Sequence, residues 1–215
     1  MITFMKTPNN LGVLVVLVLL ASACQQKTPV KRSQEWLKSL RVATVPAKKA
    51  SDLALVALKK DVKKQGNSRE GLERVKRAEI LKKRTNEVEA EIDKLKTLLM
   101  TDAGGGLDPQ TKMPKDPQNT AKVEEVMKAN TPKLIKALDD YVKFLSIKYK
   151  DLDLPRFAPL TKDMMYPKKM SFYEMFYGDA TVIEALSSLT VHQLTVRRYE
   201  AEVLKKLGAG DLSVY

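Results

Sequence analysis

The chain has 215 residues, of which 44% are hydrophobic and 30% are charged, values ordinary for one soluble globular domain with a core. Its net charge of +12 would suggest nucleic-acid binding in a cytosolic protein, but the charges alternate in sign along the expected helices and no RNA-binding or zinc-finger motif is present. Nucleic acid is therefore excluded as a partner. A solvated basic surface remains one interpretation, and contact with anionic lipid headgroups or an acidic protein is the other.

The first 24 residues differ from the rest of the chain. Lys6 is their only charge, residues 11–20 are apolar, and three small residues lead into Cys24, the only cysteine. This pattern is typical of an export signal. Residues 11–23 fall short of the roughly 20 residues that cross a bilayer, so we do not expect them to remain as a membrane span.

The small residues before Cys24 resemble a bacterial lipobox, in which the cysteine is acylated and the signal peptide, here residues 1–23, is removed. Most lipoboxes have Leu three places before the cysteine, where this chain has Ala21. An ordinary signal with a nearby cysteine is the alternative, but it would leave an unpaired thiol in an oxidising compartment. We therefore predict lipidation at Cys24 and a membrane-anchored mature chain on the periplasmic side of the envelope. By resemblance to enterobacterial sorting signals, Gln25 favours the outer membrane over the inner membrane.

The mature chain predicts a tether over residues 24–32, a helical bundle over residues 33–208 and a short tail over residues 209–215. A first helical piece over residues 33–44 should be broken or kinked at Pro46, and the helix should resume to residue 64. The apolar positions of these two pieces are Trp36, Leu37, Leu40, Val42, Leu53, Val56, Ala57 and Val62.

Residues 68–100 predict the longest helix, around which antiparallel partners should pack. Its apolar positions recur with heptad spacing, at Leu81, Thr85, Val88, Ile92, Leu95 and Leu99. The opposite face has a Glu four residues before a base in three pairs, Glu70 with Arg74, Glu73 with Arg77, and Glu79 with Lys83. Asn67 or Ser68 should cap the start, and Gly104 to Gly106 should end the helix.

The segment 103–118 has three Gly and three Pro residues and is expected to be a loop. A short turn of helix over residues 120–128 should precede another helix that Thr131 caps and Pro132 begins, with a buried stripe ending at Tyr149. A last helix, capped by Asp179, should run to Leu207 with one inward stripe, and no strand pattern competes. The sequence thus predicts an all-α antiparallel bundle of about four long helices with a long irregular loop before the last.

That irregular loop, residues 150–178, is too rich in Met and aromatic residues for a solvated linker. It either packs over the end of the bundle or offers a surface to a partner protein, and packing is favoured. The residues of this possible partner surface are Met164, Met165, Tyr166, Phe172, Tyr173, Phe176 and Tyr177.

Residues with catalytic or metal-binding chemistry are sparse. His192 is the only histidine and has no second Cys or spaced carboxylates to form a metal site, so a partly exposed helical His is expected. Asp139 with Asp140, and Glu124 with Glu125, point to different helix faces. Without a nucleophile beside a base, we predict no enzyme activity, no cofactor, no metal and no small-molecule substrate.

The order of segments resembles the N-terminal periplasmic domain of the GldM/PorM family, which forms the shaft of the gliding-motility and type IX secretion motor. The likeness covers roughly residues 30–207, and its sharpest motifs are the loop Thr111-Lys-Met-Pro-Lys115 and the tail Tyr199-Glu-Ala-Glu-Val-Leu204. The resemblance implies a helical bundle that acts by protein contact and has no catalytic residues to transfer.

This chain differs from the family in two ways: a lipobox replaces the transmembrane helix, and no β-rich domains follow before residue 215. We therefore expect an accessory or regulatory subunit of the secretion machinery in place of the shaft. Its expected partners are other envelope proteins, and a homodimer is a further option. The alternative is a lipid-anchored binding module for an envelope lipid or lipoprotein, unrelated to secretion.

Overall fold

The computed structural model describes residues 29–154 and 180–209. The described residues from 33 onward belong to one compact unit, and the described part of the other unit is limited to residues 29–32. The described residues form four α-helices and no strand: α2 (Pro29–Lys64), α3 (Arg69–Leu98), α4 (Thr120–Lys148) and α6 (Val182–Leu204). Two short π-helical segments, η1 (Leu99–Ala103) and η2 (Lys205–Ala209), extend α3 and α6. The predicted all-α bundle is confirmed.

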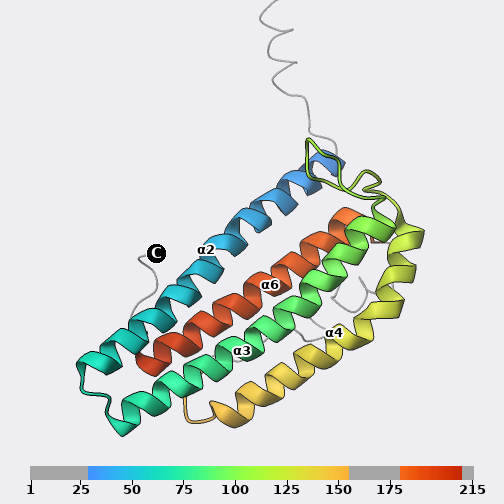
Figure 1. Ribbon diagram of the computed structural model, residues 1–215. Coiled ribbons are helices and arrows are strands. Elements are labelled where there is room, and N and C mark those ends of the chain that lie inside the picture. Colours follow the sequence, from blue (N-terminus) through green and yellow to red (C-terminus); the bar gives the residue numbers. More distant parts are fainter. Residues whose placement is uncertain (1–28, 155–179, 210–215) are drawn as a thin grey trace, which may run out of the picture. The chain divides into compact units, whose positions relative to one another are not determined.

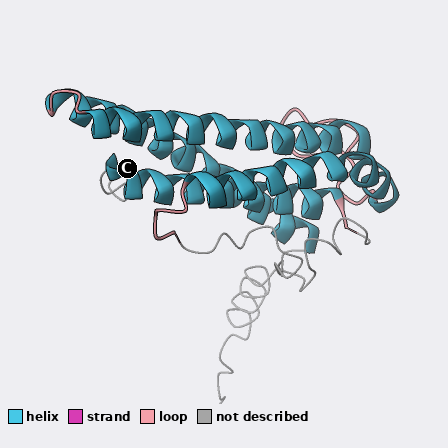
Figure 2. Cartoon of the chain, turned by 90° about the horizontal axis from the view of Figure 1, so that it is seen from below, coloured by secondary structure: helices cyan, strands magenta, loops and turns pink. Residues whose placement is uncertain are grey.

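The four helices lie side by side, with α3 antiparallel to α2, α4 and α6 (Figure 1). Helix α6, the last in the sequence, lies between α2 and α3 in this view. Seen from below, the described chain again consists of helices joined by loops (Figure 2). The chain therefore places its last described helix between two helices that come much earlier in the sequence.

The predicted heptad stripe of α3 is confirmed, because all six of its positions are buried: Leu81, Thr85, Val88, Ile92, Leu95 and Leu99. The ion pairs along α3 differ from the predicted ones. Glu79 contacts Lys59 of α2 at 2.6 Å, and Arg77 contacts Asp151 beyond α4 at 2.6 Å. The charged residues of α3 thus connect it to its neighbours, because those partners lie within reach in the bundle.

Of the two alternatives predicted at Pro46, a break is wrong, and the helix start predicted at Pro132 is wrong as well. Helix α2 continues through Pro46, and α4 continues through Pro132 from Asn119, whose side chain accepts a hydrogen bond from the Lys122 N–H. A proline removes one backbone donor and costs about 3 kcal/mol inside a helix. Burial of the apolar face on both sides of each proline outweighs that penalty.

The helix starts are fixed by side-chain caps. Ser68 caps α3 by accepting a hydrogen bond from the Gly71 N–H at 3.1 Å, which selects it over Asn67. Thr181 caps α6 in a capping box with Glu184, so Asp179, which lies outside the described residues, is not the cap.

The buried face of α2 also differs from the prediction. Leu37, Leu40 and Val62 are buried as expected, but Trp36 and Val42 are exposed. The second half of the helix buries Ser51, Ala54 and Leu58, and it leaves Leu53, Val56 and Ala57 exposed. Helix α2 therefore has apolar side chains on two faces, of which one contributes to the core.

Helix α6 is buried around most of its circumference, where the sequence predicted a single inward stripe. Sixteen of its residues are buried, and Arg198 and Glu202 are its exposed residues. His192, predicted to be partly exposed, is fully buried. Polar residues that would face water on a peripheral helix are consequently inside the bundle here.

Candidate functional site

The residues that the sequence singled out for function lie outside the described residues. They are Cys24 in the export signal and, in the irregular loop, Met164, Met165, Tyr166, Phe172, Tyr173, Phe176 and Tyr177. Acylation and a partner surface in the loop remain predictions. The described residues instead contain a buried charge network, a pocket and an ordered loop.

The buried charge network is centred on Glu89 of α3. Its carboxylate accepts hydrogen bonds from the Nε and Nη2 atoms of Arg197 and from Nε2 of Gln193, both on α6. Lys48 of α2 lies 3.3 Å from the same carboxylate. Arg197, which is fully buried, also donates to Glu200 at 2.8 Å and to Asn86 at 2.8 Å. This network joins α2, α3 and α6.

Gln193 extends the network toward the next turn of α3. Its Oε1 accepts a hydrogen bond from Lys96 Nζ at 2.9 Å, and its Nε2 donates to Asp93 at 3.2 Å. Because one amide both accepts from a buried ammonium and donates to carboxylates, it fixes the rotation of α6 against α3.

The electrostatics of the network keep its acid and base charged. Burial alone would raise the pKa of Glu89, but the hydrogen bonds from Arg197 and Gln193 outweigh it, and the pKa is lowered. Burial would likewise lower the pKa of Arg197, but its hydrogen bond to Glu89 and its attraction to Glu200 raise it. For Lys96, burial dominates and lowers the pKa. A charged, hydrogen-bonded pair of this kind fixes the packing of helices; it offers no base to a substrate.

This network was not predicted from the sequence. Glu89 follows the seam residue Val88 and was assigned no role, and of the polar residues of α6 only His192 was considered, as a partly exposed residue. The available signal was the spacing of Arg197 and Glu200, which lie three residues apart on α6 and therefore on the same face of the helix.

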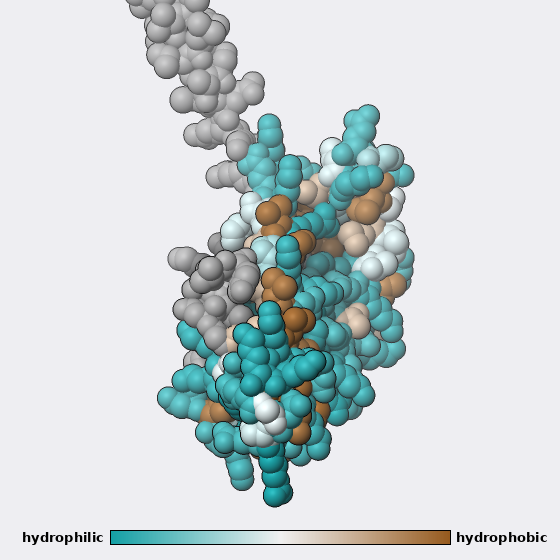
Figure 3. Space-filling model, turned by 60° about the vertical axis from the view of Figure 1, so that its left-hand side comes forward, coloured by the Kyte–Doolittle hydropathy of each residue, from teal (hydrophilic) through white to brown (hydrophobic). Residues whose placement is uncertain are grey.

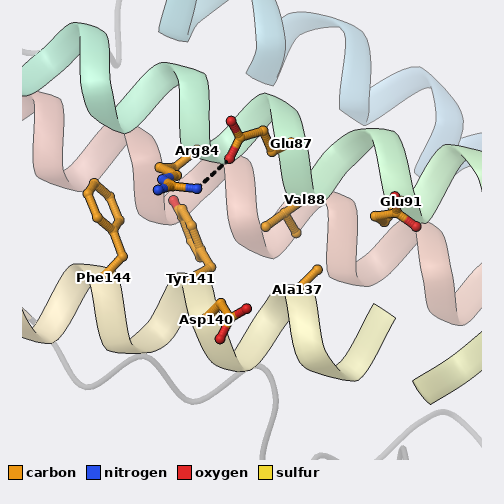
Figure 4. A pocket seen from close by; sticks show the side chains of 8 residues that line it. All are labelled: Arg84, Glu87, Val88, Glu91, Ala137, Asp140, Tyr141 and Phe144. Carbon is orange, nitrogen blue, oxygen red and sulfur yellow. Dashed lines mark hydrogen bonds and ion pairs between the residues drawn. The ribbon is translucent and has the colours of Figure 1, made fainter. Parts of the chain in front are cut away.

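A pocket of about 380 Å³ lies between α3 and α4 (Figure 4). Its rim includes Arg84, Glu87 and Asp140, and Tyr141 and Phe144 line its apolar part. Arg84 pairs with Glu87 at 2.8 Å, and Asp140 pairs with Lys136 at 2.6 Å.

The tyrosine of this pocket is also engaged within the protein. The hydroxyl groups of Tyr141 and Thr85 are hydrogen-bonded at 2.9 Å, and burial raises the pKa of Tyr141. These contacts stabilise the junction of α3 and α4 and supply no activated nucleophile.

The ordered loop between η1 and α4 contains the motif Thr111–Lys115. Asp108 accepts hydrogen bonds from the backbone N–H groups of Gln110 and Thr111, and Leu107 pairs with Pro114 in an isolated β-bridge. A Cβ atom on Gly104 would lie 2.7 Å from Cβ of Pro114, so glycine is required there. Arg41 of α2 donates to the Lys112 carbonyl at 3.2 Å, which connects this loop to the bundle.

Two negative findings apply to residues 29–154 and 180–209. They contain no group of three or more His, Cys, Asp or Glu side chains placed to hold a metal ion. None of their helices has a stretch that is both long and apolar enough to span a bilayer.

Comparison with known families gives one match. The family model described as the GldM N-terminal domain matches residues 37–210, a range that includes most of α2 and all of α3, α4 and α6. The comparison with curated proteins found no match. Because the matched range covers most of the chain, this protein belongs to the GldM N-terminal domain family, a family of components of gliding motility and type IX secretion.

Proposed function

We propose that the chain is a non-enzymatic, lipid-anchored helical protein on the periplasmic side of the envelope. In this role it is an accessory or regulatory subunit of the gliding-motility and type IX secretion machinery, and it acts by protein contact. The family match over residues 37–210 is the observation that carries the proposal. The internally paired charges of Glu89 and Arg197 are consistent with a structural role.

The anchor in this proposal is an acylated Cys24, supported by the small residues before it and by the apolar stretch of residues 11–20. Several acyl chains, at about 0.8 kcal/mol per buried methylene, would hold the mature chain to a membrane. Gln25 supports the outer membrane as its location.

Metabolic labelling with a palmitate analogue tests the anchor. The parent chain should be labelled and should fractionate with membranes, whereas Cys24→Ser should be unlabelled because it lacks the sulfur. Ser22→Ala, which keeps the cysteine and a small residue before it, is the matched control and should be labelled like the parent. A Cys24→Ser chain that is still labelled and membrane-bound would refute the anchor.

Purification of the tagged, cross-linked chain from membranes tests whether it associates with the gliding and secretion machinery. Enrichment of gliding or secretion components over a tagged, unrelated lipoprotein supports the proposed role. The alternative, a binding module unrelated to secretion, predicts that the chain recovers an envelope lipid or another lipoprotein without those components.

A further inference from the structure

Helix α2 has a stripe of apolar side chains on the face opposite the core. Val42, Val45 and Val56 are 66%, 69% and 61% exposed, and Leu53 is 36% exposed. Val42, Leu53 and Val56 were predicted to help form the core, but Ala54 and Leu58 occupy the core-facing side of this half of α2, together with Leu37 in the first half. These exposed side chains are not part of the buried core that the described residues form.

The exposed stripe follows a repeat of eleven residues. Val42, Val45 and Lys49 are spaced by three and four residues, and after four more residues Leu53, Val56 and Lys60 repeat the same spacing and the same chemistry. Lys38 begins the series, eleven residues before Lys49. We call these seven residues the outer stripe of α2. Eleven residues make three turns of about 3.67 residues each, so such a stripe runs nearly straight along a helix.

The charged residues of the outer stripe are all basic, and none of them makes an ion pair with another described residue. Lys38, Lys49 and Lys60 are exposed, whereas the neighbouring Lys48 and Lys59 are paired with carboxylates of α3. Three acidic residues of α2 are described, and all of them are engaged. Asp52 is paired with Lys82 of α3, Asp61 accepts a hydrogen bond from Gln65, and Glu35, three residues before Lys38, also has a partner. Figure 3 shows hydrophobic patches separated by hydrophilic ones on the face turned toward the viewer.

This arrangement fits one class of occupant best. Two apolar positions and one Lys in each three turns match a second helix, whose side chains interdigitate with a straight stripe and whose carboxylates pair with the lysines. A second copy of the chain would bring a like-charged stripe against this one. A membrane surface would favour large apolar and aromatic side chains over valine.

We propose that the outer stripe of α2 binds an acidic amphipathic helix of a partner protein, with an Asp or Glu facing each of Lys38, Lys49 and Lys60. The proposal shares with the proposed function the premise that the chain acts by protein contact. It does not depend on the lipid anchor or on the loop before α6.

A synthetic helix tests the proposal. The probe is a peptide of about 25 residues with Leu and Ile at the apolar positions of a 3-4-4 repeat and Glu at the positions that face the lysines. The purified full chain should bind it with an affinity that falls as salt is raised, because the contact includes exposed ion pairs. A peptide of the same composition with heptad spacing should bind more weakly, since its apolar stripe drifts away from that of α2.

Charge reversal provides the matched comparison. Lys49→Glu combined with Lys60→Glu should weaken binding at least roughly tenfold, and a peptide with Lys in place of Glu should restore it. The control variant, Lys133→Glu with Lys143→Glu, changes the net charge equally on exposed positions of α4 and should bind the acidic peptide nearly as the parent does. Circular dichroism checks that both variants remain folded.

Three outcomes would overturn the proposal. They are equal loss of binding in the two double variants, self-association of the chain that requires Val45 and Val56, and binding to anionic vesicles that requires Lys49 and Lys60 while the peptide is ignored. None of these outcomes bears on the role in secretion, which acylation and co-purification test separately.

Discussion

Arg197 and Glu89 are buried charges whose value to the fold lies in being paired with each other. Moving either charge out of water is costly, and the attraction between them compensates only while both are present and hydrogen-bonded. Gln193 and Asn86 satisfy further donors and acceptors of the pair. Removal of one partner should therefore lower the free energy of unfolding by more than the intact pair adds to it.

Arg197→Met should lower the free energy of unfolding by about 3 to 5 kcal/mol, because it leaves Glu200 buried without its cation and leaves Glu89 with only the half-exposed Lys48. Chemical denaturation of the variant beside the parent measures the change. Lys48→Met is the control. It removes a half-exposed partner of the same carboxylate and should cost less than about 1 kcal/mol. Equal losses in the two variants would show that the buried pair has no special role.

The lowered pKa of Glu89 predicts acid sensitivity. Its carboxyl has a usual value of 4.5, and hydrogen bonds from Arg197 and Gln193 outweigh burial and keep the folded pKa below it. The stability from this group is complete above 4.5 and is lost as the pH falls through the folded pKa, because the unfolded chain then binds the proton first.

Urea unfolding between pH 7 and pH 3 measures this slope. The stability of Glu89→Gln should fall less steeply below pH 4.5 than that of the parent. Glu124→Gln, a change at an exposed carboxylate, should keep the parent's slope. If the stability of the parent and of Glu89→Gln falls equally steeply with pH, the contacts of Glu89 with α6 do not lower the pKa of its carboxyl.

At the scale of the element, α2 contains a proline in its interior and two apolar faces. Pro46→Ala restores a backbone donor and removes a ring that crowds the preceding turn, so it should raise the free energy of unfolding by up to about 3 kcal/mol. Thermal melting beside the parent measures the change. Pro109→Ala, in the loop before α4, should instead lower stability by about 0.4 to 1 kcal/mol, because it frees the unfolded chain. A lower melting temperature for Pro46→Ala would contradict this expectation.

The helices differ in how far the sequence predicted them. The buried stripe of α3 was predicted correctly, including the polar Thr85, because a helix packed on one side has a periodicity that hydrophobicity alone reveals. The buried face of α2 was predicted wrongly in its second half, because the sequence offers two apolar faces and only tertiary packing decides that Leu58 is buried in place of Val56. The single inward stripe predicted for α6 was too narrow, because polar residues such as Gln193 and Arg197 are also buried, paired with other residues inside the bundle.

At the scale of the whole molecule, the sequence predicted the all-helical class and the family, while the buried network required the packing of separate segments. Glu89 and Arg197 are 108 residues apart, and no local pattern connects them. The residues predicted for anchoring and for partner contact lie outside the described residues. Their predicted roles rest on the sequence and are tested by experiment.

The loop before α6 offers such an experiment. If it packs over the bundle, Phe172→Ala and Phe176→Ala should each lower stability by about 3 to 5 kcal/mol, since each would empty a core position. If it is a docking surface, both variants should melt like the parent and lose a partner that the parent captures. Resemblance to the family favours packing, and thermal melts of the two variants distinguish the alternatives.

Because α6 follows the other three described helices in the sequence, α2, α3 and α4 leave the ribosome before the helix that they surround. Until α6 arrives, Glu89 has no Arg197, and the apolar faces of three helices have no common partner. The domain should therefore have no stable partial product during synthesis: a nascent chain that ends before residue 180 should be open to proteases, and one that includes residue 209 should become resistant in a single step. A frameshift or stop before codon 180 should therefore yield degraded fragments in place of a smaller working bundle.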